Sequence, residues 1–144
     1  MSTRALVNIV QRQEGRSFSK TLEPSAIHTQ IYKHYDGYPE RLGVTLASYL
    51  KDYDISYGVP LHDVQGPVAN GIRCLSAQLV SYMKEGPGDI YLQPPVDPDW
   101  EEYVYYVWVK EESKIMISIF DSNNECIYVG DCESLIEKYE YYDR

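Results

Sequence analysis

The sequence predicts an α+β fold, with a mainly antiparallel sheet of about five to seven strands and two or three helices packed on one face. Two observations support this prediction. Strand-like and helix-like segments are segregated along the chain instead of alternating strictly, and three strand-like segments follow one another with short turns, as in an antiparallel meander. The length of 144 residues fits a single domain over residues 1–144, with one hydrophobic core.

The N-terminal part of the chain is predicted to form strands. An apolar run indicates a first strand over residues 4–11, and a second, short strand is predicted over 16–22. Residues 26–35 alternate in hydropathy, which is typical of a strand with one core face and one polar, aromatic face. The residues predicted to lie on its core face are Ile27, Ile31 and Tyr35.

Two helices are predicted to follow. Pro39 suits the first turn of a helix because its missing N–H is not needed there, and leucines at 42, 46 and 50 recur at helical spacing. A helix is therefore predicted over residues 39–52, with a long loop over 53–69 after it. Apolar residues recur again from Ile72 to Met83, and the sequence Gly86-Pro87-Gly88 stops this second helix.

The second half of the chain is predicted to return to strands and to end in a helix. A short strand over 89–93 leads into a stiff, proline-rich segment over 94–99. The pattern Ser134-x-x-Glu137 resembles a capping box and predicts the start of the last helix. Between them lie the three strands of the meander, over 103–110, 114–120 and 125–129.

The charge of the chain is uneven and limits the classes of partner. The net charge is −9: residues 1–72 carry 7 basic and 7 acidic side chains, whereas residues 73–144 carry 6 basic and 15 acidic ones. Direct binding to nucleic acid is not expected, because phosphate contacts need a basic surface. A protein partner or a cation suits the acidic half better, and the 15 tyrosines suit an interface or a ligand pocket.

The sequence predicts a cytosolic protein without membrane association. No apolar run approaches the ~20 residues of a membrane span, and the N-terminal residues lack the apolar segment of a secretory signal. The cysteines at 74, 126 and 132 form no CxxC pair, which favours reduced thiols. No cofactor or metal is predicted, since neither a glycine-rich phosphate loop nor a metal-ligand spacing occurs.

The most distinctive segment spans residues 32–43, where the predicted strand turns into the first predicted helix. A helix start offers free N–H groups and the positive end of the helix dipole, so basic side chains near it suit a phosphate. Neighbouring tyrosines suit stacking on a base. We therefore predict a site for a small nucleotide formed by Tyr32, Lys33, His34, Tyr35, Asp36, Tyr38 and Arg41.

Three other interpretations stay open. The pair Asp36-Gly37 could form the turn, with Asp36 capping the helix, which would make the segment a structural corner. His34 and Asp36 could share a proton in a small phosphoesterase, although the sequence favours a non-enzymatic protein because no catalytic motif occurs. The acidic second half could instead inhibit a host protein, for example by imitating the phosphates of DNA.

The chain resembles a set of small proteins encoded by bacteriophages and prophages. Their signature is Tyr-x-His-(Trp/Tyr)-Asp-Gly-Tyr-Pro-x-x-(Leu/Val)-Gly, and residues 32–43 read YKHYDGYPERLG, with Arg41 where the family usually has glycine. The resemblance implies a phage-type accessory protein acting in the cytoplasm of a bacterial host. Together with the nucleotide site predicted above, it leads to the hypothesis of a non-enzymatic, anti-defence protein that sequesters a small nucleotide immune signal, with identical chains assembling to close the pocket.

Overall fold

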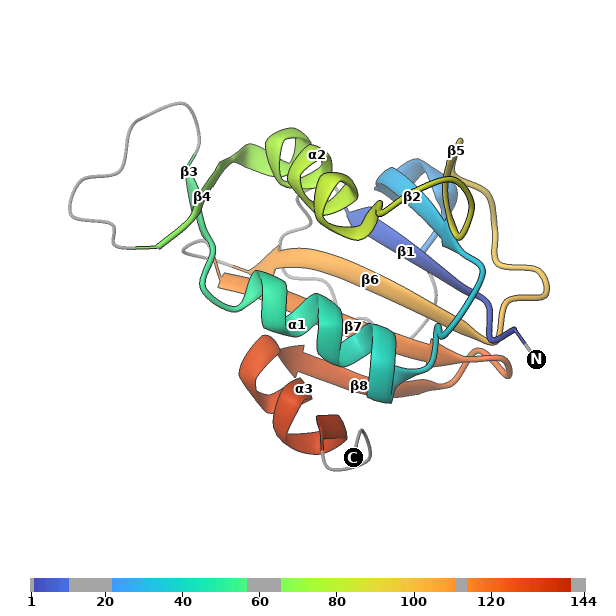
Figure 1. Cartoon of the computed structure of the whole chain (residues 1–144). Helices are drawn as coiled ribbons and strands as arrows, with labels where there is room; N and C mark the ends of the chain where they lie inside the picture. The colour runs from blue at the N-terminus through green and yellow to red at the C-terminus, as the bar shows by residue number, and fades with distance from the viewer. Residues whose placement is uncertain (1, 11–21, 57–65, 111–113, 141–144) are drawn as a thin grey trace.

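The structure, a computed structural model, describes residues 2–10, 22–56, 66–110 and 114–140. Its centre is a six-stranded sheet with the strand order β5-β2-β1-β6-β7-β8, and Figure 1 shows helices lying over this sheet. Neighbouring strands run antiparallel, except that β1 and β6 are parallel. The predicted α+β fold with a mainly antiparallel sheet is confirmed.

The strands of the sheet form where the sequence is apolar or alternating. The first strand is buried along its whole length, which suits its place near the middle of the sheet. The strands have these bounds: β1 Ala5–Val10, β2 Ile27–Lys33, β5 Ile90–Gln93, β6 Tyr103–Lys110, β7 Lys114–Asp121 and β8 Cys126–Asp131.

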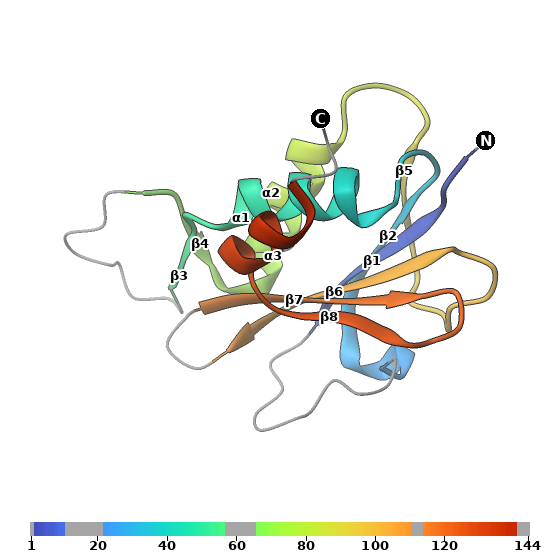
Figure 2. The same cartoon turned by 90° about the horizontal axis from the view of Figure 1, so that it is seen from below.

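Three α-helices cover one face of the sheet, as Figure 2 shows. They are α1 (Val44–Leu50), α2 (Gly71–Met83) and α3 (Cys132–Tyr139). Each contributes fully buried leucines to the main core, and burying one such side chain contributes about 1.5–3 kcal/mol. Two shorter helical segments are a 3-10 turn, Pro24–Ala26, and a π-helical segment, Pro39–Gly43, directly before α1.

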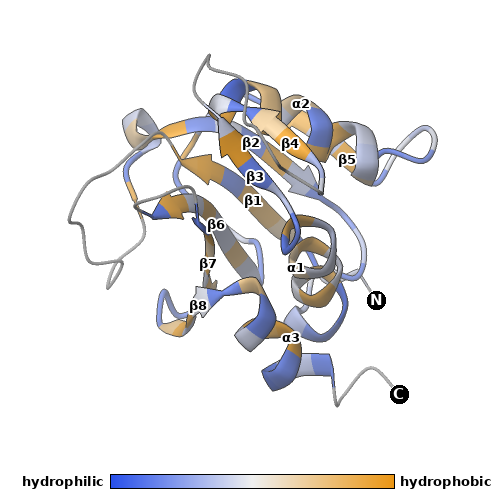
Figure 3. Ribbon diagram, turned by 90° about the vertical axis from the view of Figure 1, so that its left-hand side faces the viewer, coloured by the Kyte–Doolittle hydropathy of each residue, from blue (hydrophilic) through white to orange (hydrophobic). Residues whose placement is uncertain are grey.

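A second, smaller apolar layer lies on the opposite face of the sheet. It contains Leu6 and Val104 together with Tyr106 and Phe120, whose rings meet edge to face with centroids 5.6 Å apart. Figure 3 shows hydrophobic residues running along the central strands. The helices α1, α2 and α3 pack on the other side of the sheet, so they do not cover this smaller apolar layer.

The first predicted helix is correct in position but not in form. The N–H of Val44 bonds to the carbonyl of Pro39, five residues earlier, so the segment begins as a π-helix. The α-helix proper ends at Leu50, short of the predicted residue 52, where its buried stripe ends. The predicted loop over 53–69 contains two three-residue strands, β3 (Asp54–Ser56) and β4 (Val68–Asn70), which pair in parallel.

The predicted core face of β2 is correct at Ile31 and wrong at Ile27 and Tyr35. A register shift between Ile9 and Val10 pairs Val10 with Ile27 and Ile9 with Thr29, so Ile27 joins the smaller apolar layer while Ile31 joins the main core. This is the effect expected of a β-bulge, which moves the following side chains to the other face. Tyr35 lies beyond the end of the strand and is 51% exposed.

The last helix starts three residues earlier than predicted, since its N-cap is residue 131 instead of 134. Asp131 is its N-cap, and its carboxylate accepts a hydrogen bond from the Ser134 N–H (2.8 Å). The predicted capping box at Ser134 is therefore wrong, because Ser134 already lies in the first turn of α3.

Three other predictions concern a second N-terminal strand, the cysteine thiols and membrane-spanning segments. The strand predicted over 16–22 lies almost entirely outside the described residues. The three cysteines are free thiols, as expected. Within the described ranges, no helix is long and apolar enough to cross a membrane.

Candidate functional site

The Asp-Gly-Tyr-Pro turn after β2 is a tightly packed corner of the fold. A Cβ added to Gly37 would lie 2.7 Å from Ala5 Cβ and 2.9 Å from the Thr3 carbonyl oxygen. The Gly37 N–H donates to that Thr3 oxygen (2.9 Å), and the buried Tyr105 hydroxyl donates to the Gly37 oxygen (2.7 Å). Glycine is required here because two segments of backbone approach closely, so this part of the signature has a structural role.

Asp89 fixes the end of β2 next to this corner. Its carboxylate accepts hydrogen bonds from Lys33 Nζ (2.7 Å) and from the Tyr35 N–H (2.9 Å), and its carbonyl accepts one from the His34 N–H (2.9 Å). Burial acts to raise the pKa of Asp89, but the Lys33 ammonium and the backbone N–H groups outweigh it and hold this pKa below its usual value. Lys33, only 16% exposed, is thus committed to an internal ion pair.

The residues predicted to bind a ligand do not form one site. Side chains alternate along β2, so Tyr32 lies on the face opposite the α-helices and Lys33 on the face toward them. Tyr32 and His34 line a cleft on the first of these faces. Lys33, Asp36 and Arg41 line a separate pocket. His34 and Asp36, the pair considered for acid–base chemistry, are therefore divided between the two.

The two remaining predicted residues flank this division. Tyr35 is exposed, and its ring meets that of His34 edge to face with centroids 4.5 Å apart. Tyr38 precedes the π-helical segment, and its carbonyl accepts hydrogen bonds from the N–H groups of Arg41 (3.0 Å) and Leu42 (2.9 Å). These two N–H groups are consequently not available to a phosphate.

Aromatic rings form the walls of the cleft, which has a volume of about 830 Å³. The Tyr32 ring lies 6.1 Å from Tyr91, its partner in the pairing of β2 with β5, and 6.2 Å from Trp100 between centroids. Asp97, Asp99 and Glu101 bring three carboxylates to it. None of the described residues that line this cleft is a lysine or an arginine, although Arg4 lies over the Trp100 ring (4.3 Å) and Lys84 Nζ over the Tyr91 ring (5.5 Å). We call this feature the aromatic cleft.

Gln30 holds the segment that forms one side of the aromatic cleft against the sheet. Its side chain is 1% exposed, and its Nε2 donates to Asn8 Oδ1 (2.9 Å) and to the Val96 carbonyl (3.0 Å). Its Oε1 accepts from Gln93 Nε2 (2.6 Å) and from the Val96 N–H (3.3 Å). Both the nitrogen and the oxygen of this buried amide therefore have hydrogen-bond partners, as buried polar groups require. Through these bonds the sheet fixes the position of the segment that follows β5.

Arg4 organises the inner side of the aromatic cleft. Its guanidinium carbon lies 4.3 Å from the centroid of the Trp100 ring. The Tyr32 hydroxyl and His34 Nδ1 are hydrogen-bonded (2.9 Å). Burial raises the pKa of Tyr32 more than Arg4 lowers it, so the phenol keeps its proton at neutral pH.

The second pocket, of about 290 Å³, is less suited to an anion than the sequence predicted. Lys33 is paired with Asp89, and Arg41 Nη2 lies 3.6 Å from Asp36 Oδ2, with both of these side chains more than half exposed. Such an exposed pair stabilises the fold little. Glu85 adds a further carboxylate, so two cations face three acidic groups among the lining residues.

Sequence reasoning missed the two rings that define the aromatic cleft. Tyr91 reaches Tyr32 only through the pairing of β2 with β5, which are separated in the sequence by α1, β3, β4 and α2. Trp100 is one of two tryptophans and stands between Asp99 and Glu101, directly after the proline-rich segment. The sequence signal that could have identified Trp100 is a tryptophan flanked by two acidic residues.

Comparisons with protein-family models, with curated proteins and with solved structures find no match to this chain. In the part of the chain that the structure describes, no group of three or more His, Cys, Asp or Glu side chains is arranged to hold a metal ion. The function is therefore best argued from the geometry and charge of the aromatic cleft.

Proposed function

We propose that this protein is a non-enzymatic binding protein that captures a basic protein partner at the aromatic cleft. One observation carries the proposal: half-exposed aromatic rings line an open cleft whose charged lining residues are all carboxylates. Aromatic side chains dominate the energetically important centres of protein interfaces. Carboxylates around such a centre favour partners with a basic surface and accelerate their approach.

The distribution of exposed hydrophobic residues supports an interface in this place. Seven large hydrophobic residues are exposed among the described residues, and three of them line the aromatic cleft. These three are Tyr91, Val96 and Trp100, each at least 50% exposed. Exposed apolar surface gathered in one region marks a binding site more often than scattered residues do.

The resemblance to phage-encoded accessory proteins supports a setting for this activity. In the cytoplasm of a bacterial host, a small acidic protein that covers a basic surface would act as an inhibitor, and its target would be a host defence factor or another nucleic-acid-binding protein. Basic surfaces of the latter kind are built for phosphates, which is why a cluster of carboxylates competes for them.

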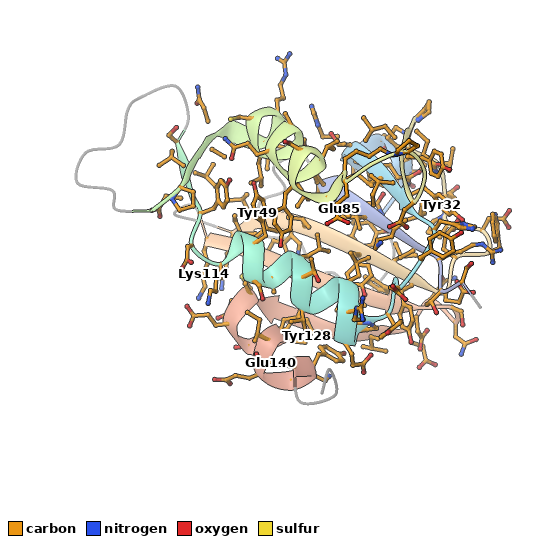
Figure 4. The ribbon with its side chains drawn as sticks, viewed as in Figure 1. Tyr32, Tyr49, Glu85, Lys114, Tyr128 and Glu140 are labelled. Carbon is orange, nitrogen blue, oxygen red and sulfur yellow. The ribbon has the colours of Figure 1, made fainter. Side chains whose placement is uncertain are left out.

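The proposal is tested by capture from a bacterial lysate with three forms of the protein. The double variant Asp97→Lys, Asp99→Lys should lose a basic partner that the wild type retains, and the partner should be released as salt rises. The control Glu137→Lys, Glu140→Lys makes the same change of charge in exposed residues at the end of the molecule that carries α3. Figure 4 shows Glu140 there, far from Tyr32. Equal capture by both double variants would contradict the proposal.

A second candidate function is the sequestration of a small nucleotide by an assembly of identical chains. Its support is the group of rings around Tyr32, which suits stacking on a base, and the position of Lys33 and Arg41 in the neighbouring pocket. Thermal melting against a panel of linear and cyclic nucleotides separates the two candidates. A ligand-dependent rise in the midpoint that Arg41→Ala abolishes would favour sequestration; a flat panel favours the protein partner.

A further inference from the structure

We propose that the aromatic cleft binds an arginine side chain of the partner, held against the exposed rings of Trp100 and Tyr91 on either side of Tyr32. This inference rests on the proposed function and names the group that the cleft recognises. In the sheet, β2 lies between β5 and β1. Tyr91 on β5 therefore approaches Tyr32 from one side, and Trp100, which packs on Arg4 just before β1, approaches it from the other.

The rings of Tyr91 and Trp100 flank Tyr32, and both are exposed to a cation from solvent. The planes of Tyr91 and Trp100 are inclined to that of Tyr32 by 40° and 43°, with centroids 6.1 and 6.2 Å away. Aromatic faces attract cations placed within about 6 Å of the ring centroid, and arginine is found there more often than lysine. Because Tyr91 is 52% and Trp100 55% exposed, a side chain entering from solvent reaches both rings.

Trp100 already binds one guanidinium inside the protein. The Arg4 guanidinium carbon lies 4.3 Å from the Trp100 centroid, within the range of a cation–π contact. Arg4 is held in place because its N–H donates to Glu102 and its carbonyl accepts from the Glu102 N–H. More than half of the Trp100 side chain remains exposed, so the indole has free surface for a second guanidinium from a partner.

The carboxylates around Trp100 favour arginine over a neutral or anionic group. Asp97, Asp99 and Glu101 all line the cleft, and Glu101 is oriented by a hydrogen bond from the Asp99 N–H (3.1 Å). A guanidinium stacked on an indole directs its N–H groups outward in its own plane, where carboxylates accept them in pairs. A lysine ammonium is a strongly hydrated point charge and cannot stack in this way.

A titration with arginine and citrulline peptides tests the inference directly. The probes are a short Gly-Arg-Gly-Arg-Gly amide, the same peptide with citrulline, and the same peptide with lysine, each added to the uniformly ¹⁵N-labelled full chain. Citrulline has nearly the shape of arginine without its charge. We expect saturable shifts of the Trp100 indole N–H with arginine, at least about tenfold weaker binding for the other two peptides, and little change at Trp108.

Variants at the cleft complete the test. Trp100→Leu should reduce arginine-peptide binding by about tenfold, and Trp100→Phe, which keeps an aromatic face, by less. If the citrulline peptide binds as well as the arginine peptide, or if Trp100→Leu binds the arginine peptide with unchanged affinity, the inference is wrong. A partner that is captured by the wild type but not displaced by the arginine peptide would overturn the inference and leave the proposed function standing. If the wild type captures no basic partner that is released by salt, the proposed function itself is wrong.

Discussion

Replacing Gly37 by alanine should destabilise the protein strongly, although the change adds a single methyl group. The added Cβ would lie 2.7 Å from Ala5 Cβ and 2.9 Å from the Thr3 oxygen, distances at which the corner or β1 must move. Overpacking of this kind costs about 1–3 kcal/mol. The same movement weakens the hydrogen bond from the buried Tyr105 hydroxyl to the Gly37 oxygen, and a buried group left without its partner costs about 1–3 kcal/mol more.

We therefore expect a loss of about 2–6 kcal/mol in the free energy of unfolding. The measurement is urea denaturation followed by circular dichroism, with Gly86→Ala as the matched control. A Cβ at Gly86 has nothing within 4 Å, and its φ is not positive, so this variant should stay within about 0.5 kcal/mol of the wild type. Equal stability of the two variants would refute the view that the Asp-Gly-Tyr-Pro corner is fixed by close packing.

Two further predictions concern the carboxylates that hold the fold. Asp89→Asn should lower the free energy of unfolding by about 1–2 kcal/mol at neutral pH, because the charged partner of Lys33 is lost while this site remains partly exposed. The folded-state pKa of Asp89 is depressed. The stabilising effect of its carboxylate is therefore present above the ordinary aspartate pKa and disappears as the pH falls through the folded-state value. The difference in the free energy of unfolding between variant and wild type, measured by urea denaturation, should consequently shrink in acid. A constant difference down to strongly acidic pH would contradict this. Asp131→Ala removes the N-cap of α3 and should cost about 0.5–2 kcal/mol, with Asp131→Ser recovering part of the loss in the same assay.

The fold could be predicted because local patterns decide it. The turns between the last three strands and the helical spacing of the leucines are visible in the sequence, and they match β6, β7, β8, α1 and α2. The errors arose where a few residues override the pattern. A register shift between Ile9 and Val10 turned Ile27 to the other face, and three-residue strands such as β3 are too short to show a period.

The candidate site could be predicted only in part, because it is made by contacts between distant residues. Tyr32 and His34, two of the predicted ligand-binding residues, line the aromatic cleft, but strand alternation separates them from Lys33. Trp100 comes near Tyr32 because Gln30 binds the backbone of Val96, a contact between residues 66 positions apart. Nothing local in the sequence specifies such a contact.

The distribution of charge changes the choice of ligand. The sequence suggested a basic nucleotide site because it places Lys33 and Arg41 near a helix start. In the structure both are paired with carboxylates, and the π-helical segment after Tyr38 offers few free N–H groups. The larger cleft is acidic instead. A cationic partner accordingly fits the molecule better than a phosphate does.

The most direct test of this choice is the affinity of the captured partner for the wild type and for Asp97→Lys, Asp99→Lys, measured by calorimetry at low and at high salt. If the aromatic cleft binds a basic surface, the wild type binds more weakly at high salt, and the double variant binds at neither concentration while its melting temperature is unchanged. Unchanged affinity in the folded double variant, with no dependence on salt, would show that the partner binds elsewhere.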